Sequence, residues 1–105
     1  MTLVTYPKKR IEIIVEAPAL SRVLKALDGT GVLGYTVVPA LAGRGLGGQW
    51  TRDDSFNNAS HMVSVVCIVD ESLAEKAVSA VYAVVSAQIG ILSVSDVSVM
   101  RKEHF

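Results

Sequence analysis

The sequence predicts an α+β domain of the ferredoxin-like βαββαβ class, with a four-stranded antiparallel sheet and two helices on one face. Apolar residues alternate as in strands in four segments and recur at helical spacing in two others. These segments follow one another as strand, helix, strand, strand, helix, strand, which is the split βαβ order. The chain has 105 residues, 50% of them hydrophobic, so we expect a single domain over residues 1–105.

The first two elements are a strand and a short helix. The stretch "KKRIEIIVEA" places Ile11, Ile13 and Val15 on one side of a half-buried strand. Pro18 then opens a helix, because proline is tolerated in a first turn. The apolar stripe of this helix comprises Leu20, Val23, Leu24 and Leu27. A glycine-containing stretch after Asp28 ends it.

A second strand, "GYTVVPAL", precedes a long segment without periodicity. Pro39 marks either an edge strand or a bulge near the end of this strand, since proline cannot donate to a ladder. We predict a long mobile loop over about 42–59, because glycine and polar residues bury little surface on ordering. Structureless loops of this length are uncommon in compact domains and usually functional.

The second half repeats the pattern. "SHMVSVVCIV" is almost wholly apolar and predicts a central strand. Asp70 is expected to cap a helix over "ESLAEKAVSAVYAVVSAQI", and Gly90 is expected to end it. The last strand is "ILSVSDVSVM", where the alternation slips at Ser95–Asp96 and predicts a bulge. A short polar tail follows.

Composition excludes several classes of protein. The formal net charge is zero, which gives no steering toward nucleic acid or anionic membranes. No apolar run is long enough for membrane insertion, and the first charges follow rather than precede apolar residues, so we expect a cytoplasmic protein without a signal peptide.

The apolar content is high for so short a chain, which predicts oligomerisation through the helix-free sheet face. Cys67, the lone cysteine, is expected to be a buried hydrophobe.

The segment "GRGLGG" spells G-x-G-x-x-G from Gly43 to Gly48. A dinucleotide fingerprint would need a helix to open there, and "QWTRDDSFNNAS" has no amphipathic period. Two interpretations stay open. The segment is either a plain flexible loop or a phosphate cradle, in which glycines turn their N–H groups toward an anion and Arg44 supplies a bidentate charge.

Other reactive residue types are sparse. His61 and His104 are the only histidines and show no metal-ligand spacing, so no metal site is expected. Asp53 and Asp54 fit a solvated turn, and no nucleophile–base pair is visible, so we expect no catalytic residues and no enzyme. Trp50 either packs locally and fixes the loop in place or serves as an anchor for a partner protein.

Taken together, "GYTVVPALAGRGLGG", the element order and the final strand ending at Arg101 resemble the P-II signalling proteins. The resemblance runs from about Lys9 to Arg101. It is closest to the P-II-like branch associated with inorganic-carbon uptake, which includes a regulator of a bicarbonate transporter and carboxysome-associated proteins.

The resemblance implies a homotrimer with adenine-nucleotide sites in the clefts between subunits and a loop that docks on a target. The positions that match the family's nucleotide site are Gly34, Thr36, Gly43, Arg44, Gly45, Gly90, Arg101 and Lys102. Gly34 and Thr36 would line the adenine pocket, and Gly43 to Gly45 would hold phosphates. Trp50 and Arg52 are the candidate partner-docking residues on the loop.

Departures from the family pattern refine the expected function. The glycine- and lysine-rich motif before the last strand is replaced by "SAQIGILSV", so ADP or AMP is expected in preference to ATP. The expected function is a nucleotide sensor, with bicarbonate as a candidate second ligand. Its partner would be a membrane transporter of inorganic carbon or a carboxysome component. The alternatives are a bacterial microcompartment shell subunit and a metal-tolerance trimer of the same fold.

Overall fold

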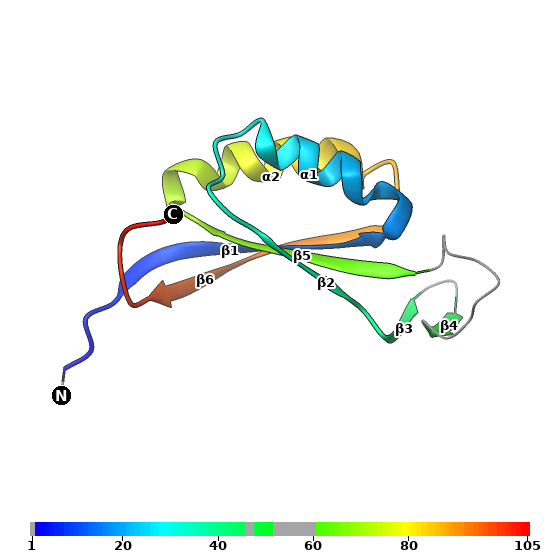
Figure 1. Cartoon of the computed structure of the whole chain (residues 1–105), viewed down its shortest axis with the longest axis horizontal. Coiled ribbons are helices and arrows are strands. Elements are labelled where there is room, and N and C mark those ends of the chain that lie inside the picture. The colour runs from blue at the N-terminus through cyan, green and yellow to red at the C-terminus, as the bar shows by residue number, and fades with distance from the viewer. Residues whose placement is uncertain (1, 46–47, 52–60) are drawn as a thin grey trace.

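A computed structural model describes residues 2–45, 48–51 and 61–105. The elements are β1 (Tyr6–Glu16), η1 (Ala17–Ala19), α1 (Leu20–Asp28), β2 (Thr36–Pro39), β3 (Ala42–Gly45), β4 (Gly48–Thr51), β5 (Met62–Val69), α2 (Glu71–Val85) and β6 (Gly90–Val99). Four strands form an antiparallel sheet in the order β2-β5-β1-β6, and both helices cover one of its faces (Figure 1). The predicted ferredoxin-like α+β architecture is confirmed.

Strand β1 lies in the middle of this sheet and determines its register. It pairs with β5 from Lys9↔Val69 to Glu16↔Met62 and with β6 from Tyr6↔Val99 to Val15↔Gly90. The prediction that β5 is central is therefore confirmed. Strand β2 pairs only with β5, so Pro39 lies on an edge strand, as its missing N–H requires.

The core fills the space between the sheet and the helices. Its members are Ile11, Ile13 and Val15 from β1, Val63, Val65, Cys67 and Val69 from β5, Ala19, Val23 and Leu27 from the first helical segment, and Ala74, Ala77, Val81 and Val85 from α2. The expected apolar sides of both β1 and α1 are therefore correct. Burial raises the pKa of the Cys67 thiol, which keeps it protonated and unreactive, as expected for a small buried hydrophobe.

The bulge predicted at Ser95–Asp96 is absent. The pairing of β1 with β6 continues without interruption, with Ser95 opposite Arg10 and Asp96 opposite Lys9. Asp96 occupies a position on the helix-covered side, where the alternation would call for an apolar residue. Its carboxylate forms an ion pair with Lys9, so a polar cross-strand pair replaces an apolar one at this end of the sheet.

The predicted start of α2 is correct, and its predicted end is not. Asp70 is the N-cap residue, as expected, although its side chain makes no capping hydrogen bond and pairs with the Lys8 ammonium instead. The helix stops at Val85, and Gly90 begins β6 rather than capping the helix. A Cβ at Gly90 would lie 2.9 Å from the Ile14 carbonyl oxygen, so close strand packing is what requires glycine there.

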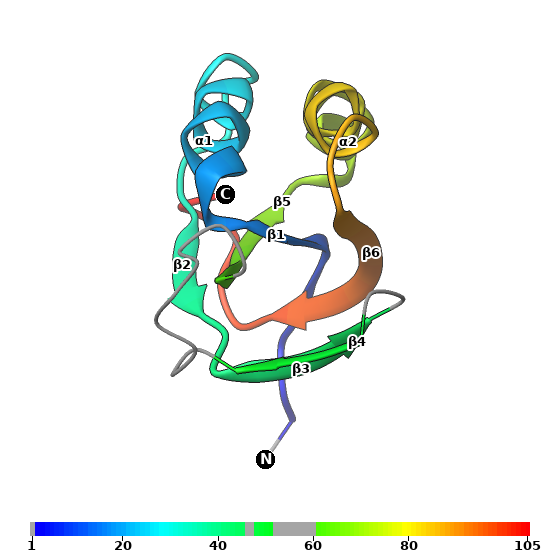
Figure 2. The ribbon, with the colours of Figure 1, turned by 90° about the vertical axis from the view of Figure 1, so that its right-hand side faces the viewer.

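The segment predicted to lack regular structure contains a hairpin. Strands β3 and β4 pair antiparallel from Ala42↔Thr51 to Gly45↔Gly48 and form a sheet of their own. The hairpin lies on the side of the main sheet away from the helices (Figures 1 and 2). The prediction was wrong here, because this pairing rests on backbone hydrogen bonds and leaves little apolar pattern. Residues 46–47 and 52–60, including Arg52, lie outside the described residues, and mobility of the segment stays a prediction.

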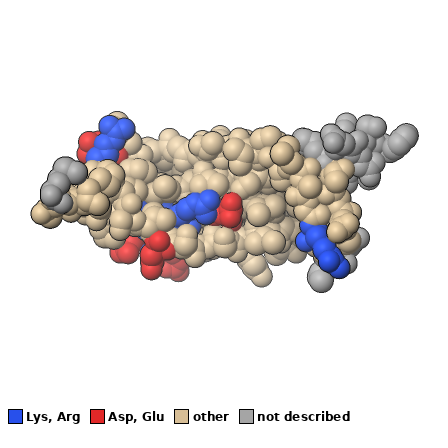
Figure 3. All heavy atoms as spheres, turned by 90° about the horizontal axis from the view of Figure 1, so that it is seen from below, with Lys and Arg blue, Asp and Glu red and all other residues tan. Residues whose placement is uncertain are grey.

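The helix-free face of the main sheet carries apolar side chains, as expected. Ile14, Val66 and Ile68 are half-buried there, and Ile91 is 61% exposed. A charged group interrupts this surface, where Glu12 accepts a hydrogen bond from Ser64 and forms an ion pair with Arg10. Figure 3 shows this face, on which charged side chains form a few small groups within a largely uncharged surface. Such a surface is typical of one that another protein covers.

Replacing Gly90 with alanine should destabilise the protein. The new Cβ would meet backbone at 2.9 Å and the Val15 and Val85 side chains at 3.0 and 3.2 Å, so strands must shift. Overpacking of this kind costs about 1–3 kcal/mol. Gly29→Ala is the matched control, because its nearest neighbours are at 3.6 Å and its φ of −76° suits alanine. Urea unfolding at one protein concentration compares the two. Equal stability of both variants would contradict the packing argument.

Candidate functional site

Two of the predicted nucleotide-binding residues lie at the open edge of the sheet, around the start of β2. Thr36 is the first residue of β2 and is exposed, opposite Val66. Gly34 precedes it and is exposed as well, and a Cβ there would meet open space within 4 Å. This edge has no strand beyond it in the described sheet, so a ligand or a neighbouring molecule can approach the backbone of β2 directly.

The next three predicted residues belong to the hairpin that follows β2. Gly43 is opposite Trp50, Arg44 opposite Gln49, and Gly45 opposite Gly48. An open hollow of about 430 Å³ is lined by Ala42, Gly43, Arg44, Gln49, Trp50 and Thr51. Arg44 is exposed, and none of the ion pairs among the described residues involves it. Its guanidinium is therefore available for an anion.

Trp50 is half-buried rather than fully exposed. It packs against Gly43, where its ring occupies the space that a side chain would need. Of the two interpretations left open for Trp50, this contact supports local packing. The partner-anchor interpretation remains a proposal.

The tail after β6 contacts the first residues of β1 through two cation–π interactions. The Lys102 ammonium lies 5.7 Å from the centre of the Tyr6 ring, and the Lys8 ammonium lies 5.5 Å from the centre of the Phe105 ring. Each contact joins a cation to an aromatic face. In one contact the tail supplies the cation and β1 the ring, and in the other β1 supplies the cation and the tail the ring. Arg101 is exposed beside this attachment.

Within one chain, the predicted nucleotide-binding residues lie far apart. Strand β6 has ten residues, so Gly90 at its start lies roughly 30 Å from the tail at its end. Three strand spacings of about 4.8 Å separate β2 from β6, which puts the two edges roughly 14 Å apart. The predicted nucleotide site therefore divides into three parts: the β2 edge with the hairpin, the start of β6, and the tail.

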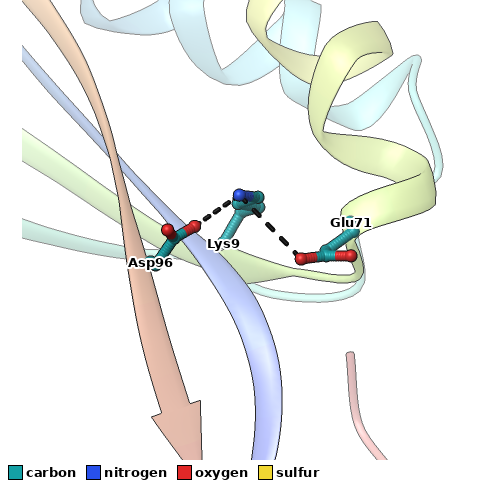
Figure 4. A network of polar contacts seen from close by, with 3 residues as sticks. All are labelled: Lys9, Glu71 and Asp96. Carbon is teal, nitrogen blue, oxygen red and sulfur yellow. Dashed lines mark hydrogen bonds and ion pairs between the residues drawn. The ribbon is translucent and has the colours of Figure 1, made fainter.

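A charged cluster that sequence reasoning missed lies where α2 begins. Lys9 contacts Asp96 and lies 3.9 Å from Glu71, so it links β1 to β6 and to α2 (Figure 4). The hydrogen bond and charge of Asp96 raise the pKa of Lys9. The Lys8–Asp70 pair is adjacent, and a shallow hollow of about 320 Å³ lies beside Lys8 and Lys9. This charged clamp joins β1 to β6 and α2, and it holds three carboxylates against two ammonium groups, so it offers no unpaired cation to an anion. Its one signal at paired strand positions was Lys9 with Asp96, because Asp70 and Glu71 lie at the start of α2.

Other candidate chemistry is not supported by the described residues. They contain no group of three metal-ligating side chains, and neither of their helices is long and apolar enough to cross a bilayer. His61 accepts a hydrogen bond at its carbonyl oxygen from the Ala17 N–H at 2.7 Å, while its Nε2 is buried without a partner among the described residues. His61 therefore forms no site with another titratable group in the part of the chain that the structure describes.

Comparisons with known proteins show the family and the fold. The family model of nitrogen regulatory protein P-II matches residues 8–104. The structure of CPII, a nitrogen regulatory PII-like protein from Thiomonas intermedia K12 bound to ADP, AMP and bicarbonate, has a TM-score of 0.83 and 30% sequence identity, and the match covers 95% of this chain and 94% of that one. CPII bound to ADP and bicarbonate gives a TM-score of 0.79 at 29% identity, covering 95% of each chain.

A more distant structure shares the fold. A putative PII-like signaling protein from Thermus thermophilus has a TM-score of 0.77 at 24% identity, covering 98% of this chain and 99% of that one. A search of curated proteins found no match to the sequence.

Proposed function

We propose that this chain, which belongs to the nitrogen regulatory protein P-II family, is a non-enzymatic sensor of adenine nucleotides. The observation that carries the proposal is Arg44, exposed on a glycine-rich hairpin and outside every ion pair of the described residues, in a chain similar to a protein bound to ADP, AMP and bicarbonate. An exposed guanidinium beside glycine backbone N–H groups suits a phosphate better than it suits a neutral ligand.

The sensor works as a homotrimer, because a single chain leaves the predicted site in three parts. The β2 edge with the hairpin of one subunit would face the start of β6 or the tail of its neighbour, so that glycine, arginine and lysine groups meet across the cleft. The apolar helix-free face supports the same conclusion, since a domain of this size cannot cover it with its own elements.

The preferred ligands are ADP and AMP rather than ATP, with bicarbonate as a second ligand. The segment "SAQIGILSV" before and within β6 offers no lysine for a third phosphate. Support for bicarbonate comes from CPII, whose structures contain it together with adenine nucleotides. Bicarbonate is a small anion, and it would need the same kind of donor, a guanidinium or backbone N–H, that the hairpin presents.

The regulated partner is a membrane transporter of inorganic carbon or a carboxysome component, and the sensor acts in the cytoplasm, where adenine nucleotides report energy state. The hairpin and the residues that follow it are the docking element. Support comes from the position of the hairpin, which projects from the main sheet (Figure 1) and carries both an arginine suited to a phosphate and an aromatic side chain.

Adding a charge to the helix-free face should break the assembly. Ile14 lies on that face in the central strand β1, opposite Ser64 and Ile91, so in Ile14→Glu a carboxylate would have to lose water when subunits meet. Light scattering should give a trimer for the wild type and a smaller mass for Ile14→Glu. Ser21→Glu, on the exposed side of α1, is the control and should stay trimeric. A monomeric wild type would refute the trimer, and a hexamer would favour a shell subunit.

Removing the Arg44 side chain should weaken ADP binding. A charge-assisted arginine–phosphate contact contributes roughly 1.5–3 kcal/mol, so Arg44→Ala should weaken binding by about 10- to 100-fold. Arg44→Lys should recover only part of this loss, because lysine lacks the planar fork. Calorimetry with ADP measures both. The fold should survive, since Arg44 is exposed. Unchanged affinity in Arg44→Ala would move the phosphate role to Arg101.

Capture of the partner should depend on nucleotide. The tagged protein should retain a membrane transporter from solubilised membranes to different extents with and without ADP, because the ligand changes the population of hairpin conformations. Deleting residues 50–58 should abolish capture while leaving the main sheet intact. Capture that is independent of nucleotide and survives the deletion would contradict a docking role for this segment.

A further inference from the structure

The contact between Trp50 and Gly43 is unusually close. A Cβ built on Gly43 would lie 2.5 Å from Trp50 Cζ2, 2.8 Å from Cε2 and 3.1 Å from Nε1. Real Cβ atoms do not approach other atoms at 2.5 Å, so the indole ring lies directly against the glycine backbone. Gly43 is therefore glycine because the ring needs its space, a reason separate from any phosphate.

The hairpin has two chemically different sides. Directly opposed residues share a side and neighbours along a strand alternate, so Trp50 and Gly43 lie on one side while Arg44 and Gln49 lie on the other. The ring on one side therefore fixes the orientation of the strand that carries the guanidinium on the other.

Little else among the paired residues of the hairpin can hold its two strands in register. The pair Gly45↔Gly48 has no side chains to pack, and β3 and β4 form a sheet separate from the main one. Isolated two-stranded hairpins are marginally stable in water. Trp50 is the one tryptophan of the chain and the largest apolar side chain among the paired residues of this hairpin.

We propose that Trp50 is a positioning residue for Arg44: by packing on Gly43 it holds β3 and β4 in register and presents the guanidinium to the phosphates of an adenine nucleotide. This inference rests on the proposed function. In this proposal Trp50 orients Arg44 rather than binding the phosphates itself, because the pairing puts its ring on the side of the hairpin opposite to Arg44.

The first test uses the ligand-free protein and Trp50 fluorescence, which has a single source in this chain. Gly43→Ala must displace the ring, so its emission should shift to the red and acrylamide should quench it more strongly. Gly45→Ala is the matched control, because a Cβ there meets nothing within 4 Å and its spectrum should equal that of the wild type. Equal spectra for Gly43→Ala and the wild type would refute the packing.

The second test is a double-mutant cycle on ADP affinity, measured by calorimetry. Trp50→Ala should weaken ADP by about two- to fivefold, the size expected for losing one cross-strand aromatic contact. Trp50→Phe should recover most of the loss, since a smaller ring can still cover Gly43. In the Arg44→Ala background, Trp50→Ala should cause no further loss, because the residue it positions is gone. Light scattering confirms that each variant keeps the wild-type mass.

The outcomes separate the two proposals. A wild type that binds no ADP would overturn the proposed function and this inference with it. A wild type that binds ADP, with Trp50→Ala losing the same factor in both backgrounds, would show that Trp50 acts independently of Arg44 and would overturn the positioning role alone. An unchanged affinity in Trp50→Ala would do the same.

Discussion

The strict alternation of side chains along β1 is the constraint on which the rest of the structure depends. β1 pairs with β5 and β6 at once, so its buried set, Ile11, Ile13 and Val15, decides which side of each neighbour faces the helices. A slip of one residue would put Glu12 into the core and expose the isoleucines. The same register brings Lys9 opposite Asp96 and the Gly90 backbone against β1, so the charged clamp and the glycine follow from it.

That constraint also connects the proposed assembly with the proposed function. Because both helices lie on the side of the sheet that β1 buries, the other side is left with half-exposed apolar residues (Figure 3). The proposed nucleotide residues lie at the two edges and ends of the same sheet, too far apart to act together in one chain. Bringing copies together by the uncovered face is a single step that could bury the apolar surface and close the divided site.

The sequence predicted the six main elements in order, since each has enough apolar periodicity to be recognised without knowledge of its neighbours. The sequence-based prediction failed where strand pairing produces no apolar pattern. The β3–β4 hairpin uses mostly glycine and polar residues, so its only side-chain signal was the spacing of Gly43 and Trp50, which has meaning only once the strands are antiparallel. The sequence placed Asp70 correctly as the N-cap of α2 but missed the partner of its side chain, because Lys8 is distant in sequence. For the candidate site, the sequence proposed residues by their type and motif, but it could not predict their separation in space.

The stability of the hairpin would determine how far a bound nucleotide could shift its conformational populations. Shifting a two-state segment from 1:99 to 99:1 requires a difference of about 5.5 kcal/mol in binding free energy between the two states. One arginine–phosphate contact supplies roughly 1.5–3 kcal/mol, so it could not order a wholly disordered segment by itself. Under the proposed positioning role, a hairpin held in register by Trp50 on Gly43 would start much closer to equal populations of its two states. A single contact would then be enough to change these populations severalfold, and a second anion could complete the shift.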